Sequence, residues 1–308
     1  MKHIIYKLML LLAVPVLTTS CIKEDYDDCD NVTIYFQYLA DGNTDVLYQY
    51  MSKVDLYVFD EGGHLLSSRQ YNKDELSNFA KPSFKLPAGV RYKVVAVGNA
   101  GDNTELTDMN AADFDRIFIQ NPDWGGGNNE VATHDHNYLG QSEFFVASGD
   151  GVMNRDTVTL RSSHINLSVE VNGWPSPDEG MPLRLVIENA NAQTSLTNKV
   201  NDEKETLVPA LEWNTELGCY TTGEIPVFRM DANGALDADL SQHLLRLYGP
   251  DDELLVETSL YDYIMENDIT RDVIRQEANL PIAINFKQTN IEIKLPAWYI
   301  EDVTPGWE

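Results

Sequence analysis

Three cysteines are the residues whose positions point most clearly to chemistry. The first, Cys21, follows three small polar residues, a ten-residue apolar run from Leu8 to Leu17 and a basic start. A run of that length is too short to span a hydrocarbon core, which needs about 20 residues. A basic start, a short apolar stretch and small residues before a cut point together predict a signal peptide over residues 1–20.

The run that ends in Cys21 resembles the bacterial lipobox, in which the thiol of the first mature residue receives a diacylglycerol. Thr18 stands where the lipobox usually has Leu, and Leu17 lies one place further out, a looseness similar to the lipoboxes of Bacteroidales. The resemblance implies a palmitate-type lipid on Cys21 and attachment to the outer membrane. The alternative is an ordinary cysteine just past a normal cut.

Residues 21–30 form an acidic tether that includes Glu24, Asp25, Asp27 and Asp28. This patch resembles the surface-export signal of Bacteroidales lipoproteins, which implies a location on the cell surface. The same charges also describe a solvated, flexible linker, because charge runs are generally hydrated. The two interpretations are compatible.

Cys29 and Cys219 are the candidates for a disulfide. If Cys21 carries lipid, only these two remain, and an oxidising compartment permits them to pair. The bridge would tie the tether to the second half of the chain. The alternative is that both thiols stay free, because the sequence does not show whether their Cα atoms approach within about 7 Å.

His134-Asp135-His136 is the densest group of metal-ligand residue types. Alternate residues of an extended segment share a face, so the two histidines could hold one metal ion. No third His or Cys lies nearby in the sequence, and we interpret the group as part of a solvated loop without a metal. Residues 231–237 have oxygen donors and a glycine but lack EF-hand spacing, which predicts a turn between strands.

The sequence carries no motif of a known enzyme class. It has no Gly-x-Ser-x-Gly, no phosphate-binding loop and no paired CxxC. Its 49 acidic residues make chance carboxylate pairs expected, so they select no acid–base pair. We expect no catalytic residue and no cofactor. Core or interface packing is the expected role of Trp124, Trp174, Trp213 and Trp298.

The charge balance excludes nucleic acid as a partner. The net charge is −27, and it becomes −29 without residues 1–20, which hold two lysines and no acid. Phosphate backbones would be repelled by such a chain. The charge suits an extracellular body that resists nonspecific association.

Apolar residues recur with a period of two, which is the period of strands. In the segment 31–38, Val32, Ile34, Phe36 and Tyr38 share one face, as in a half-buried strand. Comparable patterns predict strands at 54–59, 91–97, 144–147, 157–160, 165–171, 183–187, 223–230, 280–286 and 290–295. Turn residues predict hairpins across 60–63 and 249–252.

Many short strands at this spacing predict an all-β fold. We expect two β-sandwiches, an N-terminal one over residues 31–155 and a C-terminal one over residues 156–308. Met109 to Ile119 could form a short helix, and Tyr261 to Arg275 could be a helix or a loop.

Several segments, taken in order, carry a resemblance to a known family. They are the lipobox Cys21, the tether ending in Asp27-Asp28-Cys29, residues 54–60 with their Gly-Gly turn, Leu86-Pro87-Ala88-Gly89, residues 94–99, and a late strand pair before Trp298. Over nearly the whole mature chain this order resembles the FimB-type minor fimbrial anchor lipoproteins of Bacteroidales. The resemblance implies two tandem transthyretin-like domains, each with a short helix or irregular insert, at the base of a fimbrium.

The resemblance also implies assembly by strand donation, in which an extended segment of one subunit completes a sheet of its neighbour. In stalk subunits of the family the acceptor groove opens by proteolysis after an arginine. No arginine occurs between Cys21 and Arg69, so we expect the first strand to stay in place. The candidate donor residues are Asn290, Ile291, Glu292, Ile293, Lys294, Leu295, Trp298, Tyr299 and Ile300. The alternative is that these late strands only complete the second domain.

The expected function is therefore a fimbrial anchor and assembly subunit that supports adhesion. Its expected partners are fimbrial stalk subunits, the outer membrane through lipid, and a host or bacterial surface ligand through the assembled fimbrium. The alternative function is a surface glycan-binding lipoprotein of a nutrient-uptake system.

Overall fold

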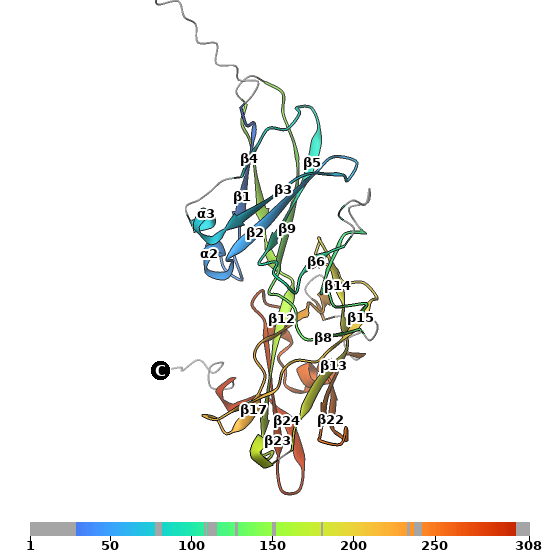
Figure 1. Ribbon diagram of the computed structural model, residues 1–308. Helices are drawn as coiled ribbons and strands as arrows, with labels where there is room; N and C mark the ends of the chain where they lie inside the picture. The colour runs from blue at the N-terminus through green and yellow to red at the C-terminus, as the bar shows by residue number, and fades with distance from the viewer. Residues whose placement is uncertain are drawn as a thin grey trace, which may run out of the picture.

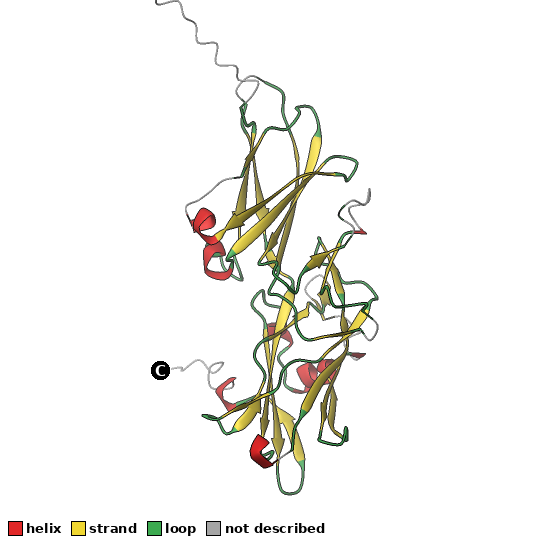
Figure 2. Ribbon diagram, viewed as in Figure 1, coloured by secondary structure: helices red, strands yellow, loops and turns green. Residues whose placement is uncertain are grey.

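The computed structural model describes residues 29–77, 82–107, 109, 116–126, 129–149, 152–179, 181–232, 235–236 and 242–299. Over these residues the chain is mostly β, and the helices are short (Figure 2). Figure 1 shows an elongated molecule, with the N-terminal half above the C-terminal half. The expectation of a β-rich fold from the period of two is confirmed.

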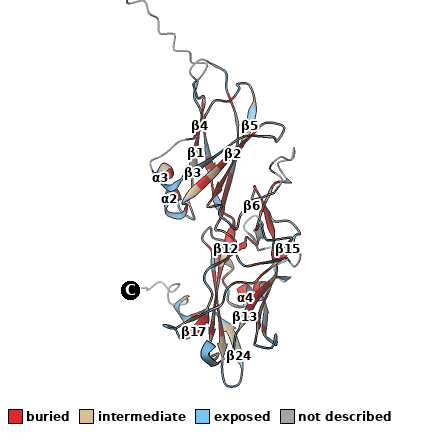
Figure 3. Ribbon diagram, viewed as in Figure 1, coloured by how far each residue is buried: buried red, intermediate tan, exposed pale blue. Residues whose placement is uncertain are grey.

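Two sheets face each other in the N-terminal half. One holds β1 (Val32–Gln37) between β10 (Asn154–Thr159) and β4 (Ser83–Phe84). The other runs in the order β11 (Arg161–Ser162), β9 (Tyr138–Phe145), β5 (Arg91–Gly98), β2 (Lys53–Phe59) and β3 (Leu65–Asn72). Their inner faces share one hydrophobic cluster, which includes Val32, Ile34, Val54, Leu56, Val94 and Val158 (Figure 3). The short helices of this half are α2 (Leu47–Tyr50) and α3 (Lys73–Ser77).

The C-terminal half is also built on two sheets. One runs β16 (Glu212–Asn214), β17 (Cys219–Thr221), β12 (His164–Asn172), β23 (Asn279–Phe286) and β24 (Ile291–Lys294), and β18 (Ile225–Phe228) also pairs with β12. The other runs β22 (Leu254–Ser259), β21 (Leu244–Tyr248), β13 (Arg184–Asn191), β15 (Lys204–Leu207) and β8 (Glu130–Val131). They enclose the second cluster, which includes Leu167, Val169, Leu185, Ile187, Leu245 and Ile282.

Short elements complete this half. Helix α4 (Leu260–Glu266) begins where the Ser259 Oγ accepts a hydrogen bond from the Asp262 N–H at 3.0 Å, a typical N-cap. It is followed by α5 (Thr270–Val273), while the 3-10 turn η3 (Pro177–Glu179) precedes β13. β19 (Asp231–Ala232) and β20 (Ala235–Leu236) pair as a small hairpin.

A third, smaller cluster lies against the outer face of the β5–β9 sheet. It joins Val95, Val97 and Leu139 to Ile119 on the short sheet of β14 (Gln193–Ser195), β7 (Phe118–Gln120) and β6 (Glu105–Leu106). Because apolar groups cover both of its faces, β5 carries the continuous run Val94-Val95-Ala96-Val97 rather than an alternating one.

The longer predicted strands and hairpins are confirmed. β2 pairs with β3 across the 60–63 turn, β21 with β22 across 249–253, and β23 with β24. The segment from Tyr261 to Arg275 forms α4 and α5. The helix expected to reach Ile119 is wrong at its C-terminal end, because Phe118–Gln120 is strand β7, paired with β14. Residues 110–115 lie outside the described residues.

Residue 155, where the two halves were expected to divide, lies within β10, which pairs with β1 as far as Thr159. The segment before β9 also crosses between the halves. β7 pairs with β14 and β8 pairs with β15, so strands from the first half of the sequence share sheets with strands from the second half.

Candidate functional site

Strand β1, the first element after the acidic tether, is built into the N-terminal half on both of its edges. It pairs in parallel with β10 over six residues, from Val32 with Asn154 to Gln37 with Thr159. On the other edge Val32 pairs with Phe84 of β4. The side chains of Val32 and Ile34 are fully buried, which stabilises the strand by about 1.5–3 kcal/mol for each.

The side-chain amide of Asn31 adds hydrogen bonds to the N-terminal half one residue before the strand begins. Its Nδ2 donates to the Leu86 carbonyl at 2.8 Å, and its Oδ1 accepts from the Leu86 N–H at 2.9 Å. The Asn31 carbonyl accepts from the Asn154 N–H at 2.8 Å. These bonds fix the point at which the tether enters the folded body.

The last described strand, β24, lies at the edge of its sheet. It pairs with β23 from Phe286 with Ile291 to Ala283 with Lys294. Ile291 is exposed and Ile293 is half-buried against the C-terminal cluster. The candidate donor segment is therefore an edge strand of its own half, and its outer backbone edge is paired with no other described strand.

Residues 297–299 form a helical turn after β24. The Trp298 Nε1 donates to a Glu170 carboxylate oxygen at 2.9 Å, although 48% of the Trp298 side chain stays exposed. Tyr299 packs against the C-terminal cluster, and burial raises the pKa of its hydroxyl to about 12. Ile300 lies outside the described residues.

The two cysteines expected to pair are both free in the structure. Cys29 is exposed just before β1, at the end of the strand away from the C-terminal half. Cys219 is buried on β17, where its neighbour Tyr220 pairs with Val171 near the far end of β12. Cys29 thus belongs to the start of the N-terminal half and Cys219 to a sheet of the C-terminal half, and no bridge joins them in the structure. Cys21 lies outside the described residues.

His134-Asp135-His136 lies in a loop, as expected, but the loop is not simply solvated, because each side chain has its own protein partner. His134 is buried and its Nε2 bonds the buried Glu205 carboxylate. Asp135 accepts from the Gly101 N–H at 2.7 Å and from the Thr104 hydroxyl at 2.6 Å. No group of three or more potential metal ligands occurs among the described residues.

A polar junction connects the two halves through the residues just before β23. The Glu277 carboxylate accepts hydrogen bonds from the hydroxyl of Tyr38, which follows β1, and from that of Tyr138 at 3.1 Å. The neighbouring Gln276 N–H donates to Asp41 at 3.1 Å, and its side chain accepts from the Ser162 N–H at 3.0 Å. We call residues 274–277 the junction segment.

Burial, followed by the Glu277 carboxylate, raises the pKa of Tyr38 and Tyr138 well above the usual tyrosine range. Both hydroxyls therefore stay protonated and act as donors. Arg229 fixes the other end of the junction segment by donating to the carbonyls of Arg275 and Ile274 at 2.8 and 2.9 Å. Sequence reasoning missed this junction, since Tyr38 and Glu277 are 239 positions apart and belong to no motif.

The family model of fimbrillin-A associated anchor proteins Mfa1 and Mfa2 matches residues 26–304. The chain belongs to this family. The match begins within the acidic tether and takes in every described strand. It makes the protein a member of a fimbrial anchor and adhesin family and not an enzyme. The family implies association with the cell surface and outer membrane.

Solved structures share this fold at low identity. Mfa2 from Porphyromonas gingivalis, a fimbrial anchor protein, matches with a TM-score of 0.61 at 14% identity, covering 86% of this chain and 96% of that one. A candidate polysaccharide-binding protein of Bacteroides thetaiotaomicron matches with a TM-score of 0.67 at 16% identity, covering 86% and 96%. A candidate adhesin of Bacteroides ovatus matches at 0.66 and 15%, covering 88% and 94%.

No curated protein matches the chain. Among the described residues, no helix has the length and apolar character needed to cross a membrane. The family membership confirms the fimbrial resemblance read from the ordered segments of the sequence.

Proposed function

We propose that this chain is a lipid-attached anchor subunit that holds a fimbrium to the outer membrane. Cys21 carries the lipid and residues 21–30 are the tether to the folded body. The way β1 is held in the N-terminal half, by strand pairing and burial, is the observation that carries the proposal. The strand that follows the tether is paired on both edges and is buried at Val32–Ile34, so tension on the tether acts on a strand held by the core.

The pairing of β1 with β10 and β4 also bears on the position of the chain in the fimbrium. A subunit that grows by strand donation must leave the position of one strand open. Here β1 fills that position, and the first arginine after Cys21 is Arg69, on β3. The chain therefore accepts no donor strand beside β10 and closes one end of the fimbrium.

The C-terminal region, residues 290–304, joins the anchor to the stalk subunit. β24 lies at a sheet edge, holds only four residue pairs with β23 and keeps Ile291 exposed, so little binding must be given up to reach a neighbour. Edge strands of this kind are the usual places where a second chain adds to a sheet. In this proposal the assembled fimbrium binds its ligand on host or bacterial surfaces through other subunits.

The two halves act as tandem transthyretin-like sandwiches in this proposal. Their division lies at residues 160–163, where the chain passes from β10 through β11 to β12. The N-terminal and C-terminal clusters on either side of this point support the division. The β6–β8 segment precedes β9 of the first sandwich in the sequence, but its strands β7 and β8 pair with β14 and β15 of the second half.

Replacing the lipidated cysteine tests the attachment. In cells that make fimbriae, Cys21→Ser should abolish incorporation of radiolabelled palmitate and release both chain and fimbriae into the medium. Cys29→Ser is the matched control, because it removes an exposed thiol eight positions away and should keep label and attachment. Equal palmitate labelling of the Cys21→Ser chain would refute the lipid assignment.

Truncation tests the donor assignment separately. Deleting residues 297–308 leaves β24 and the buried residues of both main clusters in place and removes only the partly buried Tyr299 from the edge of the C-terminal cluster. The monomer should therefore keep its circular dichroism spectrum and a cooperative melt. Fimbriae should then be found in the medium while the truncated chain remains in the membrane. Fimbriae that stay attached to these cells would refute a donor role for residues 297–304.

A further inference from the structure

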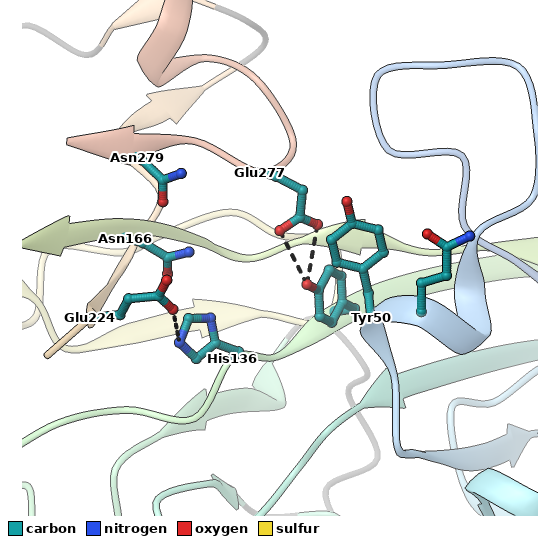
Figure 4. Close-up of a pocket in the computed structure, with 8 residues that line it drawn as sticks. Tyr50, His136, Asn166, Glu224, Glu277 and Asn279 are labelled. Atoms are coloured by element: carbon teal, nitrogen blue, oxygen red, sulfur yellow. Dashed lines mark hydrogen bonds and ion pairs between the residues drawn. The ribbon is translucent and has the colours of Figure 1, made fainter. Parts of the chain in front are cut away.

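A hollow of about 450 Å³ opens at the junction between the two halves. Its neutral walls come from both halves. Gln49 and Tyr50 end helix α2, Asn166 lies on β12, and Asn279 begins β23 (Figure 4). Among the described residues that line it none is aliphatic, so the lining favours a ligand that binds through hydrogen bonds and aromatic faces.

The charged groups of the hollow are already partnered. Glu277 accepts hydrogen bonds from both Tyr38 and Tyr138. The Glu224 carboxylate lies 3.5 Å from the His136 Nε2. A cationic ligand would have to compete with these contacts, and the test below separates such a ligand from a neutral one.

The neutral amides, in contrast, have hydrogen-bonding capacity to spare. Within the described part of the chain, the side chains of Gln49, Asn166 and Asn279 bond no protein group, and the Asn166 Oδ1 is buried without a partner. Each amide offers donors and an acceptor side by side. This pairing matches neighbouring hydroxyl groups, each of which can give one hydrogen bond and accept another.

Tyr50 supplies the flat apolar surface. Its ring packs edge-on against Tyr38 at 5.4 Å between centroids and lies 6.5 Å from Tyr138, yet 40% of the side chain is exposed. The ring is therefore held in one orientation beside the hollow while remaining accessible. A fixed tyrosine gives contact area at little loss of conformational entropy.

We propose that this hollow binds a neutral saccharide unit. The Tyr50 ring covers the C–H face of the sugar, and the three amides bond its hydroxyls. The site is separate from the strand-donation region, since β24 and residues 297–299 do not line it. It gives the anchor an adhesive contact of its own, independent of the rest of the fimbrium and of the proposed anchoring.

Saccharide binding is tested with the full chain, kept in a detergent without a sugar headgroup so that the detergent does not compete. The probes are free N-acetylglucosamine, galactose, mannose and fucose, detected by saturation-transfer difference NMR, followed by titration calorimetry of the best one. Tyr50→Ala should weaken that affinity about tenfold or more, the loss of one stacking contact. Asn279→Ala should weaken it several-fold.

Tyr48→Ala is the matched control, because Tyr48 is 51% exposed on the same helix but does not line the hollow. It should bind the sugar as the unchanged chain does. Absence of saturation transfer to all four sugars would overturn the proposal, as would equal affinity in the Tyr50→Ala and Asn279→Ala chains. Tight binding of a lysine-rich peptide that displaces the sugars would also overturn it, in favour of a cationic ligand.

Discussion

Burial decides the charge of His164, the first residue of β12. Burial, and then the neighbouring His134 and His136 rings, hold the pKa of His164 well below its usual range, with Arg229 adding to the effect. The ring stacks on Phe228 at 5.2 Å and bonds the Ser163 hydroxyl at 3.0 Å, which suits its neutral form. In the unfolded chain the pKa returns to about 6.5.

This shift makes the stability of the fold depend on pH below neutrality. Because the folded-state pKa is lowered, the unfolded chain binds more protons below about pH 6.5, and stability falls there by up to about 1.4 kcal/mol per pH unit. Above that pH His164 is neutral in both the folded and the unfolded chain, so it causes no loss of stability. Urea unfolding between pH 7.5 and 5 should show a shallower slope for His164→Phe than for the unchanged chain. His64→Gln, which alters an exposed histidine, should keep the steep slope, and equal slopes in all three would contradict the assignment.

Partnerships between distant residues are what the sequence could not predict at this scale. His134 bonds Glu205 from 71 positions away, and no pattern in either segment marks the pair. The Cys29–Cys219 pairing meets the same difficulty, since residue type suggests a partner but only the path of the chain sets the distance, and the structure shows both thiols free. By contrast, the burial of Val32, Ile34 and Tyr38 was predicted, because local alternation alone fixes which face they share.

At the scale of the element, the binding of strand β1 to the N-terminal half can be tested apart from the rest of the chain. A specific protease site inserted between Gly42 and Asn43 would cut the exposed loop after β1. The cut strand should stay bound through gel filtration, because its six pairs with β10 and its buried side chains remain. Mass spectrometry of the eluted peak measures this, and loss of the strand without denaturant would contradict it.

Once the cut strand is removed in denaturant, the remaining chain should accept a replacement. A synthetic peptide of residues 29–42 should raise its melting temperature on refolding. The same peptide with Ile34→Asp should not, because the change places a charge in the fully buried Ile34 position.

Element length decided which strands the sequence could reveal. β5 and β23 carry eight residues each, long enough for a periodic or continuous apolar pattern to be read. β6 and β8 have two residues each, and β7 has three, so no period exists within them. They form because distant strands offer free edges, and this is why the excursion of the first half onto the second was not predicted.

At the scale of the molecule, Glu277 links the end of β1 to the start of β23. Glu277→Ala removes the acceptor of two buried tyrosine hydroxyls, which should reduce stability by about 1–3 kcal/mol. Glu277→Gln keeps a neutral acceptor and should lose less. Hydrogen exchange at Tyr38 and across residues 274–279 should accelerate in the Ala variant alone. Unchanged exchange there would mean that the junction does not couple the halves.

Two parallel strand pairs lie along the long axis of the molecule. β1 pairs with β10 in the N-terminal half, and β12 pairs with β23 over seven residues in the C-terminal half (Figure 1). β10 leads through β11 into β12, so tension between the tether and the β23–β24 turn pulls one strand of each pair against the other along their length. All hydrogen bonds of a pair must then break together, whereas peeling from an end breaks them one at a time.

Single-molecule pulling can separate these two geometries in one protein. In a Cys21→Ser background, handles on the exposed Cys29 and on Thr289→Cys load both pairs along their length, while the buried Cys219 stays unmodified. Handles on Cys29 and Val152→Cys, beside the start of β10, should instead peel β1 from its first residue. Because forced unfolding follows the unfolding barrier, the first arrangement should require about twice the force or more. Equal forces would mean that the strand pairing does not carry the tension, and that the anchor holds its fimbrium through other contacts.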